Sequence, residues 1–390
     1  MVVIKEVSAK IILDSRKEKT IEISIKTNAG SFNASSPQGK STGKNAVKTY
    51  KKDPDKDVKK LNQFKDYFSG DIIENFDDLK RIEDILEGHV GANGLFAFES
   101  AVLKALAKEQ KKEVWELIMD KNIKKPKFPR LVGNCVGGGK HSEEINGKRP
   151  DFQEFEIIPN KKTVSENYES NKKSKENAEM FLKKKDKNFR SEKNDENAWM
   201  TSLNDKEVLD VLTNLNVPLG LDVAASGFCK RKKYNYNNPM LKRDIDEQFG
   251  YLSNLIKNFN LLYIEDPFDE DDFESHAKLL KKFPDSLIVG DDLIVTSSKR
   301  LQKAINMKAV NAIIVKPNQC GSLLEVKRVV ELAKTNNIKM VFSHRSGETK
   351  ETILADLAFG FQADFFKCGT EGDIRVKKIE RLIEIQKSTK

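Results

Sequence analysis

Three acidic residues in the second half of the chain each follow a short apolar run directly. They are Asp222, Glu265 and Asp291. An isolated acidic residue in such a place is more often a helix cap or an ion-pair partner than a metal ligand. Three carboxylates that face one another repel strongly, however, unless a cation neutralises them. Because this set offers only oxygen ligands, it favours octahedral coordination of Mg²⁺ or Mn²⁺ over zinc.

Two lysines and a histidine hold the equivalent place after three later runs. They are Lys316, His344 and Lys367. Lysine is rarely buried without a partner or a function. Two lysines in one pocket would lower each other's pKa, which would make a neutral amine available as a base near neutral pH. The alternative is that both lysines pair with the carboxylates.

The residues that follow His344 suit an anion. Residues 343–348 have the sequence Ser-His-Arg-Ser-Gly-Glu. The guanidinium of Arg345, the hydroxyl of Ser346 and nearby backbone N–H groups are good phosphate-binding chemistry. This segment therefore indicates that a phosphate group binds beside the two lysines.

The spacing of these residues predicts the elements that position them. From Glu265 onward, one of them recurs about every 25 positions, about the length of a strand, a helix and two loops. Continuous apolar runs are typical of buried parallel strands. Repeated strand–helix units close into a (β/α)8 barrel, in which the carboxyl ends of the strands converge on one mouth. The spacing thus predicts an α/β barrel with three carboxylates, two lysines and one histidine around a single pocket.

The first 125 residues have a different pattern. Residues 20–27 alternate between apolar and polar side chains, as a half-buried antiparallel strand does, and residues 31–34 can return as its partner. Helical patterns follow over residues 77–87, 93–110 and 113–119. Strands followed by helices predict an N-terminal α+β capping domain over residues 1–125. Residues 126–390 then form the barrel domain.

Composition narrows the possible environments of the chain. Its 390 residues are enough for two domains, and no apolar run is long enough to span a bilayer. The four cysteines lie far apart, which argues against a zinc ribbon or a disulfide framework and predicts the reducing cytoplasm. The net charge of +9 comes from scattered lysines with few aromatic residues between them. Nucleic acid is therefore not expected as the main partner.

A series of short strings runs in order along nearly the whole chain and resembles one family. The strings are Ile-Leu-Asp-Ser-Arg at 12–16, Ser-Thr-Gly at 41–43, Gly-Ala-Asn at 91–93, Gln-Glu-Phe at 153–155, Asp-Val-Ala-Ala-Ser at 222–226, Ile-Glu-Asp-Pro-Phe-Asp at 264–269, Gly-Asp-Asp-Leu at 290–293 and Ser-His-Arg-Ser-Gly-Glu-Thr at 343–349. Together they resemble enolase (phosphopyruvate hydratase). The resemblance implies an enolase-type barrel that reversibly dehydrates 2-phosphoglycerate to phosphoenolpyruvate.

The resemblance also implies two Mg²⁺ ions. Asp222, Glu265 and Asp291 would hold the first, which binds the substrate carboxylate. Ser41 would help to hold the second, bound together with substrate, on a loop that closes over the pocket and excludes water.

The remaining implied roles concern the substrate. Lys316 would remove the proton next to the carboxylate, and Lys367 would stabilise the charge that forms. Glu196, helped by Glu154, would protonate the departing hydroxide. The other implied substrate-binding residues are Arg345 and Ser346 for phosphate, with His141, Gln153 and His344 lining the pocket.

The chain departs from the family pattern at several of these places. Where the family has Gly-Asp-Glu-Gly-Gly-Phe around the acid, residues 194–199 are Asn-Asp-Glu-Asn-Ala-Trp. Gly137 stands where the family has asparagine, and Lys40 where it usually has alanine. Residues 370–373, Thr-Glu-Gly-Asp, replace the usual Ala-Pro and Arg-Ser-Glu-Arg string.

Three hypotheses about function follow. The first is an Mg²⁺-dependent enolase in the cytoplasm that acts on a small phosphorylated acid as a homodimer or larger homo-oligomer. The second is an enolase-like paralogue that dehydrates a different acid, because the altered loops surround the substrate. The third is a catalytically weak protein that binds RNA or a partner protein through its basic surface.

Overall fold

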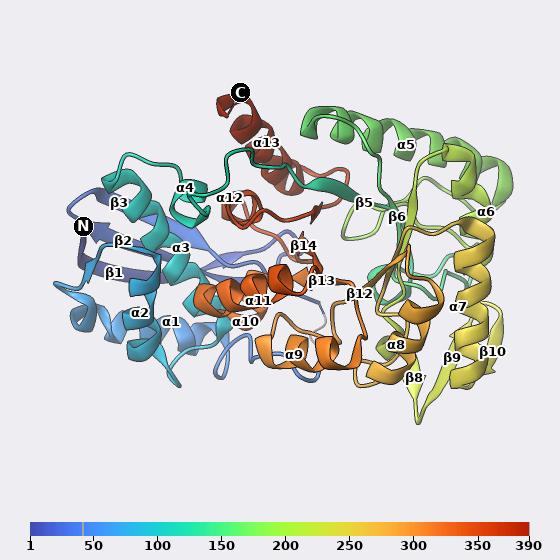
Figure 1. Ribbon diagram of the computed structural model, residues 1–390, viewed down its shortest axis with the longest axis horizontal. Helices are drawn as coiled ribbons and strands as arrows, with labels where there is room; N and C mark the ends of the chain where they lie inside the picture. The colour runs from blue at the N-terminus through green and yellow to red at the C-terminus, as the bar shows by residue number, and fades with distance from the viewer. Residues whose placement is uncertain (41–42, 390) are drawn as a thin grey trace.

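The computed structural model describes residues 1–40 and 43–389. The N-terminal elements gather at one end of the molecule and the barrel strands lie toward the other, as Figure 1 shows. This arrangement confirms the predicted class, an α/β barrel with an N-terminal α+β capping domain. None of the helices in the described ranges has the length and apolarity that crossing a membrane requires.

The capping domain is built on a four-stranded sheet with the order β3-β2-β1-β4. The predicted strands are β2 (Lys19–Thr27) and β3 (Gly30–Ser35), and β1 (Val2–Leu13) and β4 (Ile72–Ile73) complete the sheet. Alternate residues of β2, Ile21, Ile23 and Ile25, are buried, which is why its period of two identified it. The helices of this domain are α1 (Pro54–Gln63), α2 (Leu79–Leu86), α3 (Ala92–Glu109) and α4 (Val114–Ile118).

Eight strands close the barrel in the order β11-β12-β13-β14-β15-β5-β6-β7. Six of them are the predicted apolar runs: β7 (Leu219–Asp222), β11 (Tyr263–Glu265), β12 (Leu287–Gly290), β13 (Ala312–Val315), β14 (Lys339–Ser343) and β15 (Phe365–Lys367). The other two are β5 (Arg130–Gly137) and β6 (Glu154–Ile157). Buried apolar side chains such as Tyr263, Ile314 and Val341 fill the barrel.

Strand β6 is antiparallel to both of its neighbours, so the barrel is not the all-parallel one that the spacing predicted. The connection from β5 to β6 holds only a short 3-10 turn (Gly139–His141) rather than the crossover helix that a parallel return needs. Because β6 runs the other way, its first residue lies at the mouth. Glu154 accordingly pairs with Asp222 and with Gly137, the last residues of β7 and β5.

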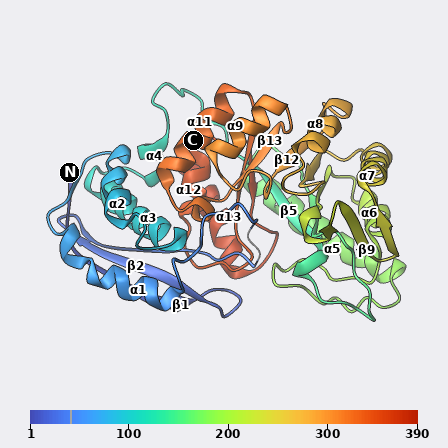
Figure 2. The same ribbon diagram turned by 90° about the horizontal axis from the view of Figure 1, so that it is seen from below.

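Helices surround the barrel on its outside, as the two ribbon views show (Figures 1 and 2). They are α5 (Val164–Lys185), α6 (Asp205–Leu212), α7 (Ile245–Phe259), α8 (Phe273–Lys282), α9 (Ser298–Met307), α10 (Pro317–Cys320), α11 (Leu323–Thr335), α12 (Ile353–Gly360) and α13 (Asp373–Ser388). A small sheet of β8 (Cys229–Lys230), β9 (Lys233–Asn237) and β10 (Met240–Arg243) follows β7.

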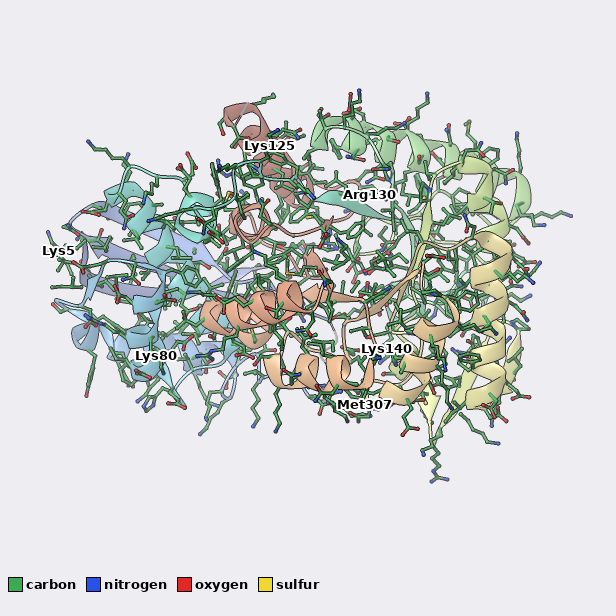
Figure 3. All side chains as sticks on the ribbon, viewed as in Figure 1. Lys5, Lys80, Lys125, Arg130, Lys140 and Met307 are labelled. Atoms are coloured by element: carbon green, nitrogen blue, oxygen red, sulfur yellow. The ribbon has the colours of Figure 1, made fainter. Side chains whose placement is uncertain are left out.

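Basic side chains are spread over the surface. Lys5, Lys80 and Lys125 are exposed and lie over different parts of the molecule in Figure 3. This distribution agrees with a solvated lysine-rich surface better than with one continuous basic face.

Candidate active site

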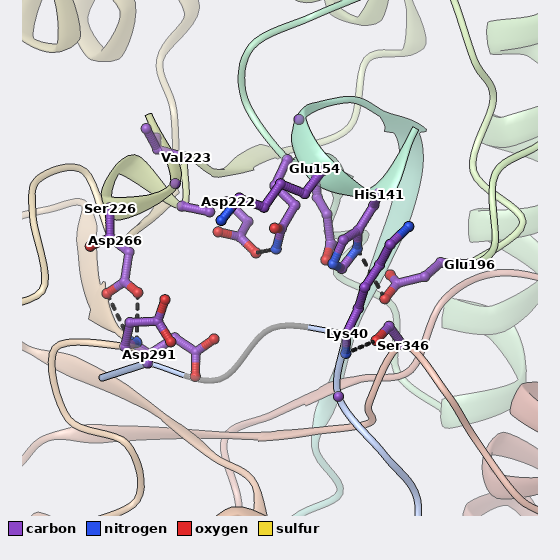
Figure 4. Close-up of a pocket in the computed structure, with 18 of the residues that line it drawn as sticks. Lys40, His141, Glu154, Glu196, Asp222, Val223, Ser226, Asp266, Asp291 and Ser346 are labelled. Carbon is purple, nitrogen blue, oxygen red and sulfur yellow. Dashed lines mark hydrogen bonds and ion pairs between the residues drawn. The ribbon is translucent and has the colours of Figure 1, made fainter. Parts of the chain in front are cut away.

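A cavity of about 300 Å³ opens at the mouth of the barrel. Charged and titratable side chains lie around it in Figure 4, with Asp266 and Asp291 on one side, His141 and Glu196 on the other, and Asp222 between them. The predicted site residues that line the cavity are His141, Gln153, Glu154, Glu196, Asp222, Asp291, Lys316, His344, Arg345, Ser346 and Lys367. Glu265 is fully buried at the end of β11, and Ser41 lies outside the described residues.

Lys367 sits among four buried carboxylates. Its Nζ lies 2.9 Å from Glu265 Oε2 and 3.3 Å from Asp222 Oδ2. It also lies 2.9 Å from Glu156 Oε1 and 3.6 Å from Glu154 Oε2. Burial opposes a charge here, but attraction to the carboxylates outweighs burial and raises the pKa of Lys367 well above its ordinary value.

Lys316 is also paired with a carboxylate. It follows β13 and donates a hydrogen bond to Asp291, which follows β12. Burial acts to lower the pKa of Lys316, yet attraction to Asp291 leaves it raised. The expectation that the two lysines lower each other's pKa was therefore wrong, because carboxylates outnumber lysines at this mouth. The pairing of both lysines with acids is the arrangement in the structure.

The donor set at the predicted metal site fits a hard cation. Among the described residues, the buried oxygens Glu265 Oε1 and Asp291 Oδ1 have no hydrogen-bond partner. A buried carboxylate oxygen without a partner is costly, and a divalent cation is the partner that oxygen ligands suit. Asp266 holds this edge in place, since its two oxygens accept hydrogen bonds from Asp291 N (2.9 Å) and Asp292 N (2.6 Å).

Glu196 lies beside His141 and across the pocket from Asp291 (Figure 4). Its Oε1 lies 3.3 Å from His141 Nδ1, and its Oε2 lies 3.9 Å from His344 Nε2. Burial favours the neutral acid, but the contact with His141 outweighs it and holds the pKa of Glu196 well below its usual range. Burial raises the pKa of neighbouring Glu154 well above its usual range. The two predicted acids are thus pushed in opposite directions.

The capping domain supplies part of the predicted phosphate site. Ser346 Oγ accepts hydrogen bonds from Arg16 Nη1 (3.1 Å) and from the backbone N–H of Lys40 (2.7 Å). A Cβ on Gly39 would lie 1.9 Å from Arg345 Nη2, so any larger residue here would require the guanidinium to move. The guanidinium of Arg16 and the backbone N–H of Lys40 therefore converge on the hydroxyl of Ser346. The ammonium of Lys40, which also lines the cavity, lies 3.3 Å from Asp195 Oδ2.

Several acids of the site were missed from the sequence, among them Asp266, Glu270, Asp292 and Glu156. Glu156 is fully buried on β6, and Asp292 lines the cavity beside Asp291. The signal for Glu156 was present, because residues two apart on a strand share a face and Glu154 was already a candidate. Asp292 was part of a quoted string, but the strand-end pattern selected only the first of its two aspartates.

Comparison with known proteins agrees with this geometry. Residues 4–118 match the family model "Enolase, N-terminal domain", and residues 126–389 match "Enolase, C-terminal TIM barrel domain". A curated enolase from Methanosphaera stadtmanae is 34% identical over 98% of this chain and 97% of its own length. One from Natronomonas pharaonis is 32% identical over 99% of both chains. One from Pyrobaculum aerophilum is 38% identical over 66% of this chain and 64% of its own length. With both halves of the chain matched in this way, the protein belongs to the enolase family.

Proposed function

We propose that the protein catalyses the reversible dehydration of 2-phosphoglycerate to phosphoenolpyruvate with Mg²⁺. The observation that carries this proposal is one cavity in which Lys316, Lys367, Asp222 and Asp291 meet the phosphate-binding candidate Arg345. Membership of the enolase family supports the same chemistry. The reaction breaks a C–H and a C–O bond, forms a C=C bond and releases water.

Asp222, Glu265 and Asp291 are the residues that would hold one Mg²⁺, and the unpartnered oxygens of Glu265 and Asp291 support the assignment. Bound there, the cation would stabilise negative charge on the substrate carboxylate and compete with Lys316 for Asp291. Ser41 is proposed for the second ion on the strength of the family pattern alone.

Each protein group then has one task. Lys316 would lose the partner that raises its pKa if Asp291 bound a cation, and in that state it would remove the proton next to the substrate carboxylate. Lys367 keeps positive charge beside the dianion that forms. Arg345 and Ser346 bind the phosphate. On the other side of the pocket Glu154, whose pKa is raised, holds the proton, and Glu196 helps to deliver it so that hydroxide leaves as water.

The test is the ultraviolet absorbance of phosphoenolpyruvate formed from 2-phosphoglycerate, with Mg²⁺ and with a chelator. Turnover that needs Mg²⁺ and disappears in Lys316→Ala is the expected result. Lys339→Ala is a matched control. Lys339 is the first residue of β14, at the end of the barrel away from the mouth, and it forms an ion pair with Asp364. No turnover above Lys316→Ala, from folded protein saturated with Mg²⁺, contradicts the proposal.

A related acid as substrate is the second candidate, favoured by the charge of the rim. Lys40, Lys44, Lys140 and Arg149 also line the cavity, and alanine is usual in the family at position 40. Extra cations favour a substrate with an additional anionic group. A panel of 2-phosphorylated acids that carry a free 3-hydroxyl and a second carboxylate decides between the two, because the better substrate has the higher kcat/KM.

We also propose a cytoplasmic homodimer or larger homo-oligomer. The four cysteines are all free, and burial raises the pKa of Cys135 to about 12, so this thiol is unreactive. Light scattering measures the oligomeric state directly, and a mass equal to one chain contradicts this part of the proposal.

A further inference from the structure

Two of the departures from the family pattern lie against each other. Gly137 ends β5, and Asn194 begins the loop that carries Glu196. A Cβ on Gly137 would lie 2.2 Å from Asn194 Nδ2, far inside van der Waals contact. An asparagine at 137 therefore requires the amide of Asn194 to leave its place, together with a smaller shift of Ser142 Oγ, which would lie 2.8 Å from the Cβ. The family has asparagine at the first place and glycine at the second, so the two residue types are exchanged in this chain.

Asn194 makes the hydrogen bonds that close the loop of Glu196. Its Oδ1 accepts from the backbone N–H of Glu196 (3.0 Å) and from that of Ala198 (2.9 Å). Its own N–H donates to Ala198 O (3.0 Å), and its carbonyl accepts from Asn197 N (3.0 Å). Four hydrogen bonds from one residue thus fix the backbone on both sides of Glu196.

The same side chain connects the loop to the facing segment of the pocket. Asn194 Nδ2 donates to Ser142 Oγ at 3.2 Å. Ser142 is the residue after His141, whose Nδ1 lies 3.3 Å from Glu196 Oε1. One amide therefore bridges the two segments that bring Glu196 and His141 together.

The carboxylate of Glu196 does not itself contact Asn194. Its recorded partners are His141, His344 and, at 3.4 Å, Asn134 Nδ2. Asn194 acts only through the backbone that carries the acid, so a change at Asn194 moves Glu196 without removing any of its partners.

We propose that Asn194 is the positioning residue for Glu196 and that it replaces the asparagine that the family carries at 137. The catalytic part of this inference rests on the proposed function. Its structural part, the steric conflict between side chains at the two positions, does not.

The test is a double-mutant cycle of Asn194→Gly, Gly137→Asn and the exchange variant that carries both changes. Asn194→Gly lowers kcat roughly tenfold or more while KM changes less than about twofold, because the acid is misplaced and substrate contacts remain. It also alters the pH profile of kcat. The exchange variant returns kcat to within about threefold of wild type, since an amide again fills the same volume.

Asn214→Gly is the matched control. Asn214 is exposed in the 3-10 turn (Thr213–Leu215) that follows α6, and its Nδ2 donates to the carbonyls of Asp210 (3.0 Å) and Val211 (2.9 Å). Losing these hydrogen bonds leaves kcat unchanged. The inference is overturned if Asn194→Gly keeps the kcat and the pH profile of wild type. It is also overturned if the kcat of the exchange variant is no higher than that of Asn194→Gly.

Thermal unfolding tests the structural part without any activity. Gly137→Asn lowers Tm by roughly 2–5 °C when Asn194 is present, because the pocket is overpacked, and by much less in the Asn194→Gly background. If Gly137→Asn lowers Tm equally with and without the Asn194 side chain, the two positions do not compensate each other. If the wild-type protein has no turnover, the proposed function fails, but this pair of Tm values still decides whether the two positions compensate each other.

Discussion

Lys367→Met removes a positive charge from among four buried carboxylates and leaves the side-chain volume nearly unchanged. Glu156 and Glu265 lie closest to the Nζ, each at 2.9 Å, and the Lys367 side chain is 4% exposed. Removing one partner of a buried ion pair typically costs about 3–5 kcal/mol, because the other charge stays in a poorly solvated site. We expect the free energy of unfolding to fall by about this amount, a large fraction of the stability of an ordinary domain.

Guanidinium unfolding followed by circular dichroism measures this loss in the presence of a chelator. Lys339→Met is the control, since its ion pair with Asp364 is half exposed (53% and 29%) and contributes less than about 1 kcal/mol. Excess Mg²⁺ reduces the difference in the free energy of unfolding between Lys367→Met and wild type by about 1 kcal/mol or more. The reason is that a cation bound to Asp222 takes over the carboxylate charge that the lysine no longer balances.

Two outcomes refute this reasoning. If Lys367→Met is as stable as Lys339→Met, the carboxylates hold protons instead of charge, and Lys367 is not what balances them. If Mg²⁺ stabilises Lys367→Met and wild type equally, Asp222 and Glu265 do not hold the cation. In that case the metal assignment has to move to the second cluster, Asp266, Asp291 and Asp292, whose oxygens lie within 4.8 Å of one another.

Three further predictions concern other parts of the chain. Burial lowers the pKa of His276 from 6.5 to about 4, so the native protein binds fewer protons than the unfolded chain in this range. The free energy of unfolding therefore falls by about 3 kcal/mol as pH falls from about 6.5 to 4. If the free energy of unfolding of His276→Gln falls equally steeply over this pH range, His276 is not the group responsible. Lys40→Ala removes an ion pair with Asp195 in which the lysine is 43% exposed, so stability changes by less than about 1 kcal/mol. Its KM rises several-fold through the lost positive charge at the phosphate site, and an unchanged KM excludes this role. Gly347→Ala would place a Cβ 1.9 Å from Asp14 Oδ2. We expect this overlap to open the contact between Asp14 of the capping domain and Gly347 of the barrel, and kcat/KM to fall at least tenfold. An unchanged kcat/KM shows that this contact is dispensable.

The sequence predicted most of the barrel because parallel strands buried on both faces are continuous apolar runs. All six runs are strands, β7 and β11 to β15. Strand β6 escaped the same pattern, because it carries Glu154 and Glu156 among apolar residues and runs antiparallel. Its mouth residue therefore stands at the start of the strand, whereas the pattern selected only residues at strand ends.

The charge state of the site was not predictable from the chain. The sequence placed Lys316 and Lys367 in one pocket, which was correct, but the pKa of a lysine depends on how many acids surround it. Glu156 was not among the candidates, although its Oε1 lies 2.9 Å from Lys367 Nζ. Strand spacing predicts which residues lie at the mouth of the barrel, but it does not show how many acids from other strands surround each lysine.

The effect of a departure from the family pattern is likewise not predictable when each position is considered alone, because it depends on the residues that surround that position in the fold. Asn197 and Trp199 look like two losses in the loop of the acid, and Glu371 and Gly372 like two more near the C-terminus. In the structure these four positions adjoin. A Cβ on Gly372 would lie 2.4 Å from Asn197 Nδ2, so the larger residue in one segment requires the smaller in the other.

The buried Lys175 joins the two altered segments. Its Nζ lies 3.1 Å from Glu371 Oε2 and 5.4 Å from the ring centre of Trp199, and its carbonyl accepts a hydrogen bond of 3.0 Å from Trp199 Nε1. A segment that had lost its role would collect changes independently of the residues around it. Here the changes at Asn194, Asn197 and Trp199 each contact a changed neighbour or the lysine that joins the segments. We infer that the loop of Glu196 has been rebuilt as a unit. That is the physical reason to expect a working acid at this position.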